Sequence, residues 1–153
     1  MAILRRIRRV IACVIVSCSL LTACNPFDEK STETIVPFED RLIDFSYETE
    51  PEDIITYTLT NKSDVTYLVG NQFRMEYRDD EEWYRVPYKP LTVFTMEGII
   101  MPKGDTREFK AKLSMIYEDL PDGHYRLIKD VGPYDNPKEE EFSIAIEFDY
   151  PFE

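Results

Sequence analysis

Cysteine is nearly absent from this 153-residue chain. Its three cysteines, Cys13, Cys18 and Cys24, all precede residue 25. Residues 25–153 therefore offer no disulfide, no thiolate metal site and no cysteine nucleophile. A domain formed by these residues has to be held together by its core alone.

Glycine and histidine are also scarce. With 5 glycines, the chain has no Gly-rich phosphate loop and no G-x-S-x-G elbow. The one histidine, His124, has no local partners for acid–base or metal chemistry, so we expect an exposed turn residue. The sequence therefore predicts no catalytic residue, no metal site and no cofactor.

Positive charge is in deficit, with a formal net charge of -12. Residues 1–23 contain four arginines and no acidic residue, so without them the charge is -16. Such a field repels nucleic acid and favours basic partners. We expect no nucleic-acid partner and interpret the charge first as a means of keeping the protein soluble.

Apolar residues are abundant, at 43% hydrophobic and 13% aromatic, which suffices for one packed domain. Residues 1–23 have the regions of a secretory signal peptide: a basic start, an apolar run over residues 10–21, then Thr22 and Ala23. The run is shorter than the roughly 20 apolar residues that span a bilayer. Secretion is favoured over the alternative, an uncleaved anchor.

The end of this leader, Leu21-Thr22-Ala23-Cys24, resembles the lipobox of bacterial lipoproteins. The resemblance implies that Cys24 is the lipid attachment site, joined to a diacylglyceryl group after cleavage before it. It also implies a protein anchored in the cell membrane on the extracytoplasmic face. Residues 24–40 are polar, contain two prolines and lack a period, so we expect a lipidated tether reaching about 20–25 Å.

Period-two alternation dominates residues 41–153 and predicts an all-β domain. In "FRMEY", Phe73, Met75 and Tyr77 point to one face of the strand and the charged residues between them to the other. "EFKAKL" (108–113) and "FSIAIEF" (142–148) repeat this pattern. We expect further strands over residues 42–47, 54–61, 65–69, 83–86 and 124–129. About seven to nine antiparallel strands fit a β-sandwich, with a closed barrel as the alternative.

"LPDGHYRL" (120–127) resembles the tyrosine corner of immunoglobulin-like domains. Asp122, Gly123 and Tyr125 carry the likeness, which implies that the Tyr125 hydroxyl bonds back to the backbone. Leu127 stands where antibody domains have a cysteine. Apolar packing would then join the two sheets.

Together, "TNKSDVTYLVGNQFRMEYRDDEEWYRVP" (60–87) and "LPDGHYRLIK" (120–129) resemble the bacterial immunoglobulin-like domain of lipoproteins from Gram-positive bacteria, mostly Firmicutes. The resemblance implies an immunoglobulin-like β-sandwich at the cell surface, and it brings no catalytic residues with it.

Several residues have two interpretations. Trp83 is expected in the core, beside Tyr57 and Leu59, and alternatively as an exposed ligand platform. The acidic clusters 79–82 and 139–141 fit charged hairpin tips and strand edges, because neither has EF-hand spacing. Tyr88 and Tyr134 lie in long connections, where sandwich domains keep binding surfaces, and are the candidate binding residues.

The sequence thus predicts a non-catalytic binding or scaffolding module at the cell envelope, with a protein or cell-wall partner. Two alternatives remain: an envelope hydrolase using paired carboxylates, and a calcium-dependent adhesion module.

Overall fold

The structure is a computed structural model, and it describes residues 25–136 and 139–152. Residues 1–24, which include Cys24 and the predicted signal peptide, lie outside the described residues. The elements are η1 (Phe38–Arg41), β1 (Ile43–Glu50), β2 (Ile54–Asn61), β3 (Tyr67–Gly70), β4 (Arg74–Asp79), β5 (Glu82–Arg85), β6 (Gly98–Met101), β7 (Thr106–Lys112), α1 (Leu113–Ile116), β8 (Gly123–Pro133) and β9 (Phe142–Tyr150). No helix among the described residues is long and apolar enough to cross a membrane.

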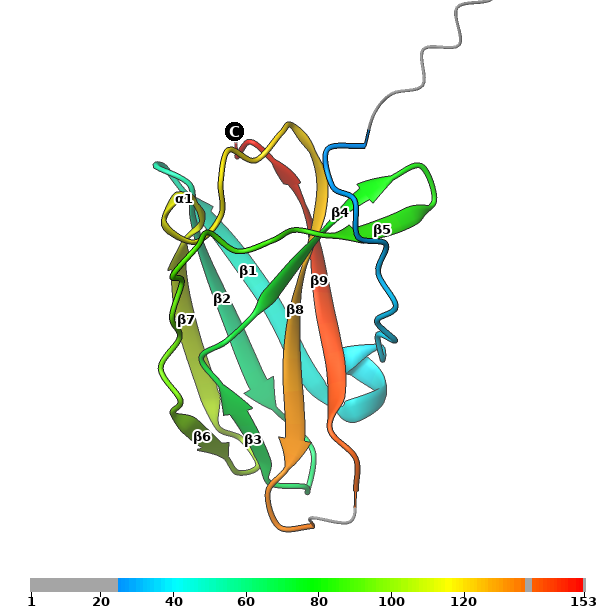
Figure 1. The fold of residues 1–153 in the computed structure, drawn as a ribbon. Coiled ribbons are helices and arrows are strands. Elements are labelled where there is room, and N and C mark those ends of the chain that lie inside the picture. Colours follow the sequence, from blue (N-terminus) through cyan, green and yellow to red (C-terminus); the bar gives the residue numbers. More distant parts are fainter. Residues whose placement is uncertain (1–24, 137–138, 153) are drawn as a thin grey trace, which may run out of the picture.

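Two antiparallel sheets pack face to face (Figure 1). One has the strand order β1-β2-β7, and the other has the order β5-β4-β8-β3-β6. In the second sheet, β4 and β3 pair with successive parts of one edge of β8, and β9 pairs with its other edge. Every paired strand is antiparallel, and no strand of the described chain joins one sheet to the other. The predicted β-sandwich is confirmed, and the barrel alternative is wrong.

The alternation in the sequence becomes the register of these sheets. Tyr57 on β2 lies opposite Phe109 on β7, and Leu127 on β8 lies opposite Ile146 on β9. All four side chains are buried in one core cluster. The strand β6 was not predicted, because "GIIM" is a short apolar run without alternation.

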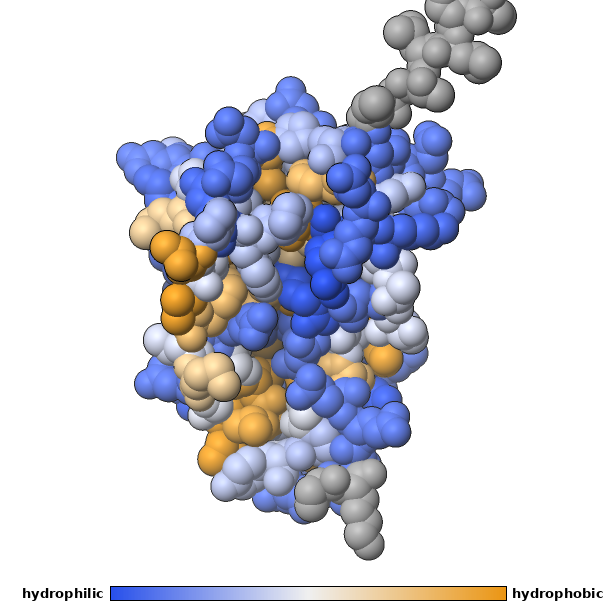
Figure 2. Space-filling view, viewed as in Figure 1, coloured by the Kyte–Doolittle hydropathy of each residue, from blue (hydrophilic) through white to orange (hydrophobic). Residues whose placement is uncertain are grey.

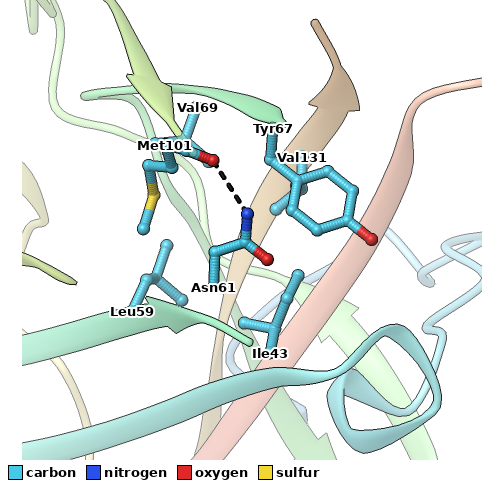
Figure 3. Close-up of a pocket in the computed structure, with 7 residues that line it drawn as sticks. All are labelled: Ile43, Leu59, Asn61, Tyr67, Val69, Met101 and Val131. Carbon is cyan, nitrogen blue, oxygen red and sulfur yellow. Dashed lines mark hydrogen bonds between the residues drawn. The ribbon is translucent and has the colours of Figure 1, made fainter. Parts of the chain in front are cut away.

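One end of the sandwich is joined by a buried asparagine. Asn61 ends β2 with 1% of its surface exposed, and its side-chain amide donates to the Met101 carbonyl oxygen of the other sheet at 2.8 Å (Figure 3). The same amide donates to the Val65 carbonyl oxygen at 2.7 Å, and Asn61 Oδ1 accepts from Ser63. The surrounding cavity of about 10 Å³ holds at most about one water molecule. Asn61, the last residue of the strand expected over residues 54–61, therefore links the sheets.

The tyrosine corner lies toward the other end. The Tyr125 hydroxyl donates a hydrogen bond to the Pro121 carbonyl oxygen at 2.6 Å, which is the bond that the sequence pattern implies. Asp122 is exposed in the turn between them. A Cβ atom on Gly123 would lie 2.4 Å from a ring carbon of Tyr77, so this position has no room for a larger residue. Leu127 is fully buried at the position of the missing cysteine.

The substitution Tyr125→Phe should lower the free energy of unfolding by about 1 kcal/mol, because it removes one buried hydrogen bond and keeps the ring. Urea denaturation measures the change. Tyr134→Phe is the matched control, because Tyr134 is 50% exposed and its hydroxyl makes no hydrogen bond within the described chain. Equal stability of Tyr125→Phe and the wild type would contradict a stabilising role for the corner.

Candidate functional site

The N-terminal segment (residues 25–36) crosses the outer face of the larger sheet (Figure 1). The Arg85 amide donates to the Glu29 carbonyl oxygen at 2.8 Å, and the Ser31 amide donates to the Trp83 carbonyl oxygen at 2.8 Å. Further along, the Val36 amide donates to the Ser143 carbonyl oxygen of β9 at 2.9 Å. These described residues, expected as a flexible tether, therefore contact both edges of the sheet. Their contacts are mostly backbone and polar ones, which leave no hydrophobic period in the sequence.

The centre of this outer face holds a buried carboxylate. Glu76 is 1% exposed, although the alternation of β4 predicts that it points to solvent. It does point outward, but the N-terminal segment covers it. The Ser31 hydroxyl donates to Glu76 Oε1 at 2.5 Å, and Arg126 donates to Glu76 Oε2 from Nε at 2.7 Å and from Nη2 at 2.5 Å. Both oxygens of Glu76 are therefore paired.

A second ion cluster lies beside the first. Arg74 forms a two-nitrogen ion pair with Asp130 and also lies 3.2 Å from Glu33 of the N-terminal segment. Burial favours a raised pKa for Asp130, but hydrogen bonds from Arg74 and Ser143 outweigh it and lower the pKa. The same ion pair raises the pKa of Arg74. The ion pair between Glu33 and Arg74 therefore holds the N-terminal segment against this face of the sheet.

Glu76→Gln should lower the free energy of unfolding by about 3 kcal/mol, because it leaves the guanidinium of Arg126 largely buried without a counter-charge. Chemical denaturation of the variant and the wild type measures the loss. Glu82→Gln is the control, because Glu82 pairs with Lys30 where both side chains are 48% exposed or more. That change should cost less than about 0.5 kcal/mol. Similar losses for the two variants would show that the N-terminal segment does not bury Glu76 in solution.

Trp83 and His124 form an aromatic contact on this outer face, so the prediction that Trp83 is a core residue is wrong. Trp83 is half-buried, and the Arg126 guanidinium lies 4.4 Å from its ring centroid. The His124 ring lies 5.8 Å away. Trp83 sits on the outer side because it pairs with Arg78, whose side chain also points outward. Arg126 covers the Trp83 ring, which would otherwise be an exposed platform.

His124 also differs from the expected turn residue, because it is the second residue of β8 and has two carboxylate partners. Nε2 lies 2.8 Å from Glu147 and Nδ1 lies 2.7 Å from Asp149, both on β9. The hydrogen bond with Glu147, followed by the contact with Asp149, raises the pKa of His124 against the opposing effect of burial. These partners lie more than 20 residues away in sequence, so local sequence could not indicate them.

Lys129 is the most unusual polar residue of the core. It has no exposed surface, and its ammonium donates to the carbonyl oxygens of Gly70 and Gln72, the second at 2.7 Å. The same group lies 4.7 Å from the ring centroid of Phe109 in the opposite sheet. Burial lowers the pKa of Lys129 to about 8. Alternation with Leu127 and Val131 already puts this residue on the inner face, a signal that sequence reasoning missed.

A groove opens at the side of the sandwich, beside the Phe109 ring that Lys129 contacts. Its volume is about 380 Å³, and it lies between β7 and the β5–β6 loop (residues 86–97). Phe73, Phe94 and Phe109 are among its lining residues. We call it the side groove. It lies along the free edge of β7, which contributes Glu108, Phe109, Lys110 and Ala111 to its lining.

The β5–β6 loop displays apolar side chains next to the side groove. Leu91, Val93 and Met96 are 96%, 87% and 99% exposed. Leu91 also has φ of 67°, a left-handed conformation that is unfavourable for a residue other than glycine. Apolar residues gather along this flank in the space-filling view (Figure 2). Neither core packing nor backbone preference explains these residues, and such features concentrate at functional sites.

Tyr88 and Tyr134, the candidate binding residues, do not lie together. Tyr88 donates its hydroxyl proton to the Phe73 carbonyl oxygen at 2.5 Å and stacks against Tyr117, so it supports the wall of the side groove. Tyr134 is exposed beyond the far end of β8. The acidic cluster 79–82 occupies the β4–β5 hairpin as expected. No group of three or more potential ligands within residues 25–136 and 139–152 could hold a metal ion.

The strand pairing defines an immunoglobulin-like β-sandwich. The sequence model of the family described as "Bacterial Ig-like domain" matches residues 43–149, and the chain belongs to this family. No curated protein sequence matches the chain. One similar solved structure is a Bordetella pertussis protein assigned as ApaA, which is 19% identical with a TM-score of 0.38. That match covers 80% of this chain and 94% of the other.

Proposed function

We propose that this protein is a lipid-anchored, non-catalytic binding module on the extracytoplasmic face of the cell membrane. The observation that carries the proposal is the sequence Leu21-Thr22-Ala23-Cys24 ahead of an immunoglobulin-like domain. A thiol is the natural lipid acceptor, because it is the strongest nucleophile among the side chains near neutral pH. Two acyl chains hold a protein stably on a bilayer, whereas one chain is marginal.

The N-terminal segment supports this arrangement and changes its dimensions. Phe27 packs against Tyr77 at a ring-centroid distance of 5.5 Å, so the domain begins three residues after Cys24. Three extended residues span about 10 Å. The domain would therefore lie close to the head groups, with the end that carries Tyr77 nearest to them. Its charge of -16 would discourage it from lying flat on anionic lipid.

The binding role is supported by the side groove and the exposed loop beside it. The described ion clusters are used within the fold: Glu76 and Asp130 each pair with an arginine, and Glu147 and Asp149 both contact His124. A groove lined by aromatic rings and flanked by exposed apolar side chains suits recognition rather than acid–base chemistry.

Mass spectrometry of the native protein, purified from membranes of cells that express it, tests the anchor. The mature chain should begin at Cys24 and carry a diacylglyceryl group. Cys24→Ser should leave the leader uncleaved and the chain free of lipid, because the acceptor thiol is gone, whereas Cys18→Ser should change neither. A native chain that begins at Met1 without lipid would overturn the anchor.

A further inference from the structure

The edge of β7 is open. β7 pairs with β2 on one side, and no strand within the described chain pairs with its other side. In an antiparallel strand, every second residue turns its N–H and C=O groups toward each neighbour. The outer edge of β7 therefore presents a row of unpaired backbone donors and acceptors. An extended peptide is the ligand that matches such a row.

The side groove lies against this edge and has room for side chains. Glu108, Phe109, Lys110 and Ala111 of β7 line it on one side, and residues 92–95 line it on the other. A strand added to β7 would run along the groove with alternate side chains directed into it. At about 380 Å³ the groove lies near the lower end of the roughly 300–1,000 Å³ range of ligand pockets.

Charge narrows the chemistry of the occupant. Lys110 is already neutralised by Glu50, whose oxygens lie 2.7 and 2.8 Å from its ammonium. Glu108 is exposed and has no ion-pair partner within the described chain. The groove therefore has one uncompensated negative charge on a protein that is strongly acidic throughout. A matching segment is apolar where it meets the aromatic rings and basic where it passes Glu108.

Another edge of this β-sandwich already pairs with an extended segment in this way. Residues 29–31 add to the free edge of β5, with an antiparallel bridge between Lys30 and Tyr84. Beside that added strand, Phe27 packs against Tyr77. An edge of this domain is thus closed by backbone pairing together with an apolar anchor.

We propose that the side groove binds an extended segment of a partner protein, which adds to β7 as a strand. Its apolar side chain contacts Phe73, Phe94 and Phe109, and a neighbouring lysine or arginine pairs with Glu108. Leu91, Val93 and Met96 then cover the bound segment and lose their exposure to water. This inference rests on the proposed role as a binding module and does not depend on the lipid at Cys24.

The probe is a phage-displayed library of random heptapeptides, selected on the purified full chain in mild detergent. Enriched peptides should share an apolar residue next to a lysine or arginine. Their affinity is then measured by fluorescence anisotropy. Val93→Asp and Glu108→Lys should each weaken binding by about tenfold or more, because they change the groove wall and its charge.

Val65→Asp is the control variant, because Val65 is 36% exposed in the turn between β2 and β3. It should leave the affinity within about twofold, as surface changes away from an interface do. Two peptides are compared, one N-methylated at the odd-numbered backbone nitrogens and one at the even-numbered ones. Only one of them should lose binding, because only one of the two sets of amides donates to β7. This control leaves the protein unchanged, so misfolding cannot produce the result.

Three results would overturn the proposal: no enrichment of peptides, affinities unaffected by Val93→Asp, or equal binding of all methylated peptides. Dimers of this chain that are lost in Val93→Asp would overturn it too, because the occupant would then be a second copy. Mass spectrometry of Cys24 reports on the anchor separately. Failure of the groove and failure of the anchor are therefore distinguishable.

Discussion

The centre of this sandwich depends on the hydrogen bonds of the buried Lys129 ammonium. A charge without access to water costs several kcal/mol unless it is fully hydrogen-bonded. The carbonyl oxygens of Gly70 and Gln72 must therefore stay in place, and they fix the connection between β3 and β4. That connection supplies Asn71 and Phe73 to the side groove, while Phe109 supplies the opposite wall under the same ammonium. The buried Lys129 therefore contacts the segments that form both walls of the side groove.

The rest of the domain uses polar contacts where related folds use a disulfide. Asn61 joins the sheets at one end, and the tyrosine corner closes the turn before β8 toward the other. On the outer face, Glu76 and Arg74 bind Ser31 and Glu33 of the N-terminal segment. Phe27 already packs against Tyr77, so the chain reaches the domain body three residues after Cys24. A lipid at Cys24 would then restrain the orientation of the domain as well as its distance from the membrane, leaving the side groove free on the flank.

Local patterning was sufficient for eight of the nine strands, because burial on one face of a strand fixes its alternation. The tyrosine corner was indicated by its resemblance to that of immunoglobulin-like domains. Local patterning could have identified Lys129, since the residue continues the inward series from Tyr125 through Leu127. It could not have found the burial of Glu76, which depends on Ser31, a residue 45 positions earlier in the chain. The partners of His124 come from strand pairing, and the side groove comes from the packing of a loop against an unpaired edge. Neither leaves a local period to recognise.

The most direct test of this account is the pKa of Lys129, measured by NMR titration of its side-chain nitrogen or ε-carbon in the folded protein. A lysine held without water between the sheets should titrate at about 8. Its resonance should be assigned by comparison with Lys129→Arg. An ordinary value near 10.4 would contradict the account, because it would mean that the ammonium reaches solvent instead of lying buried against Phe109 of the opposite sheet.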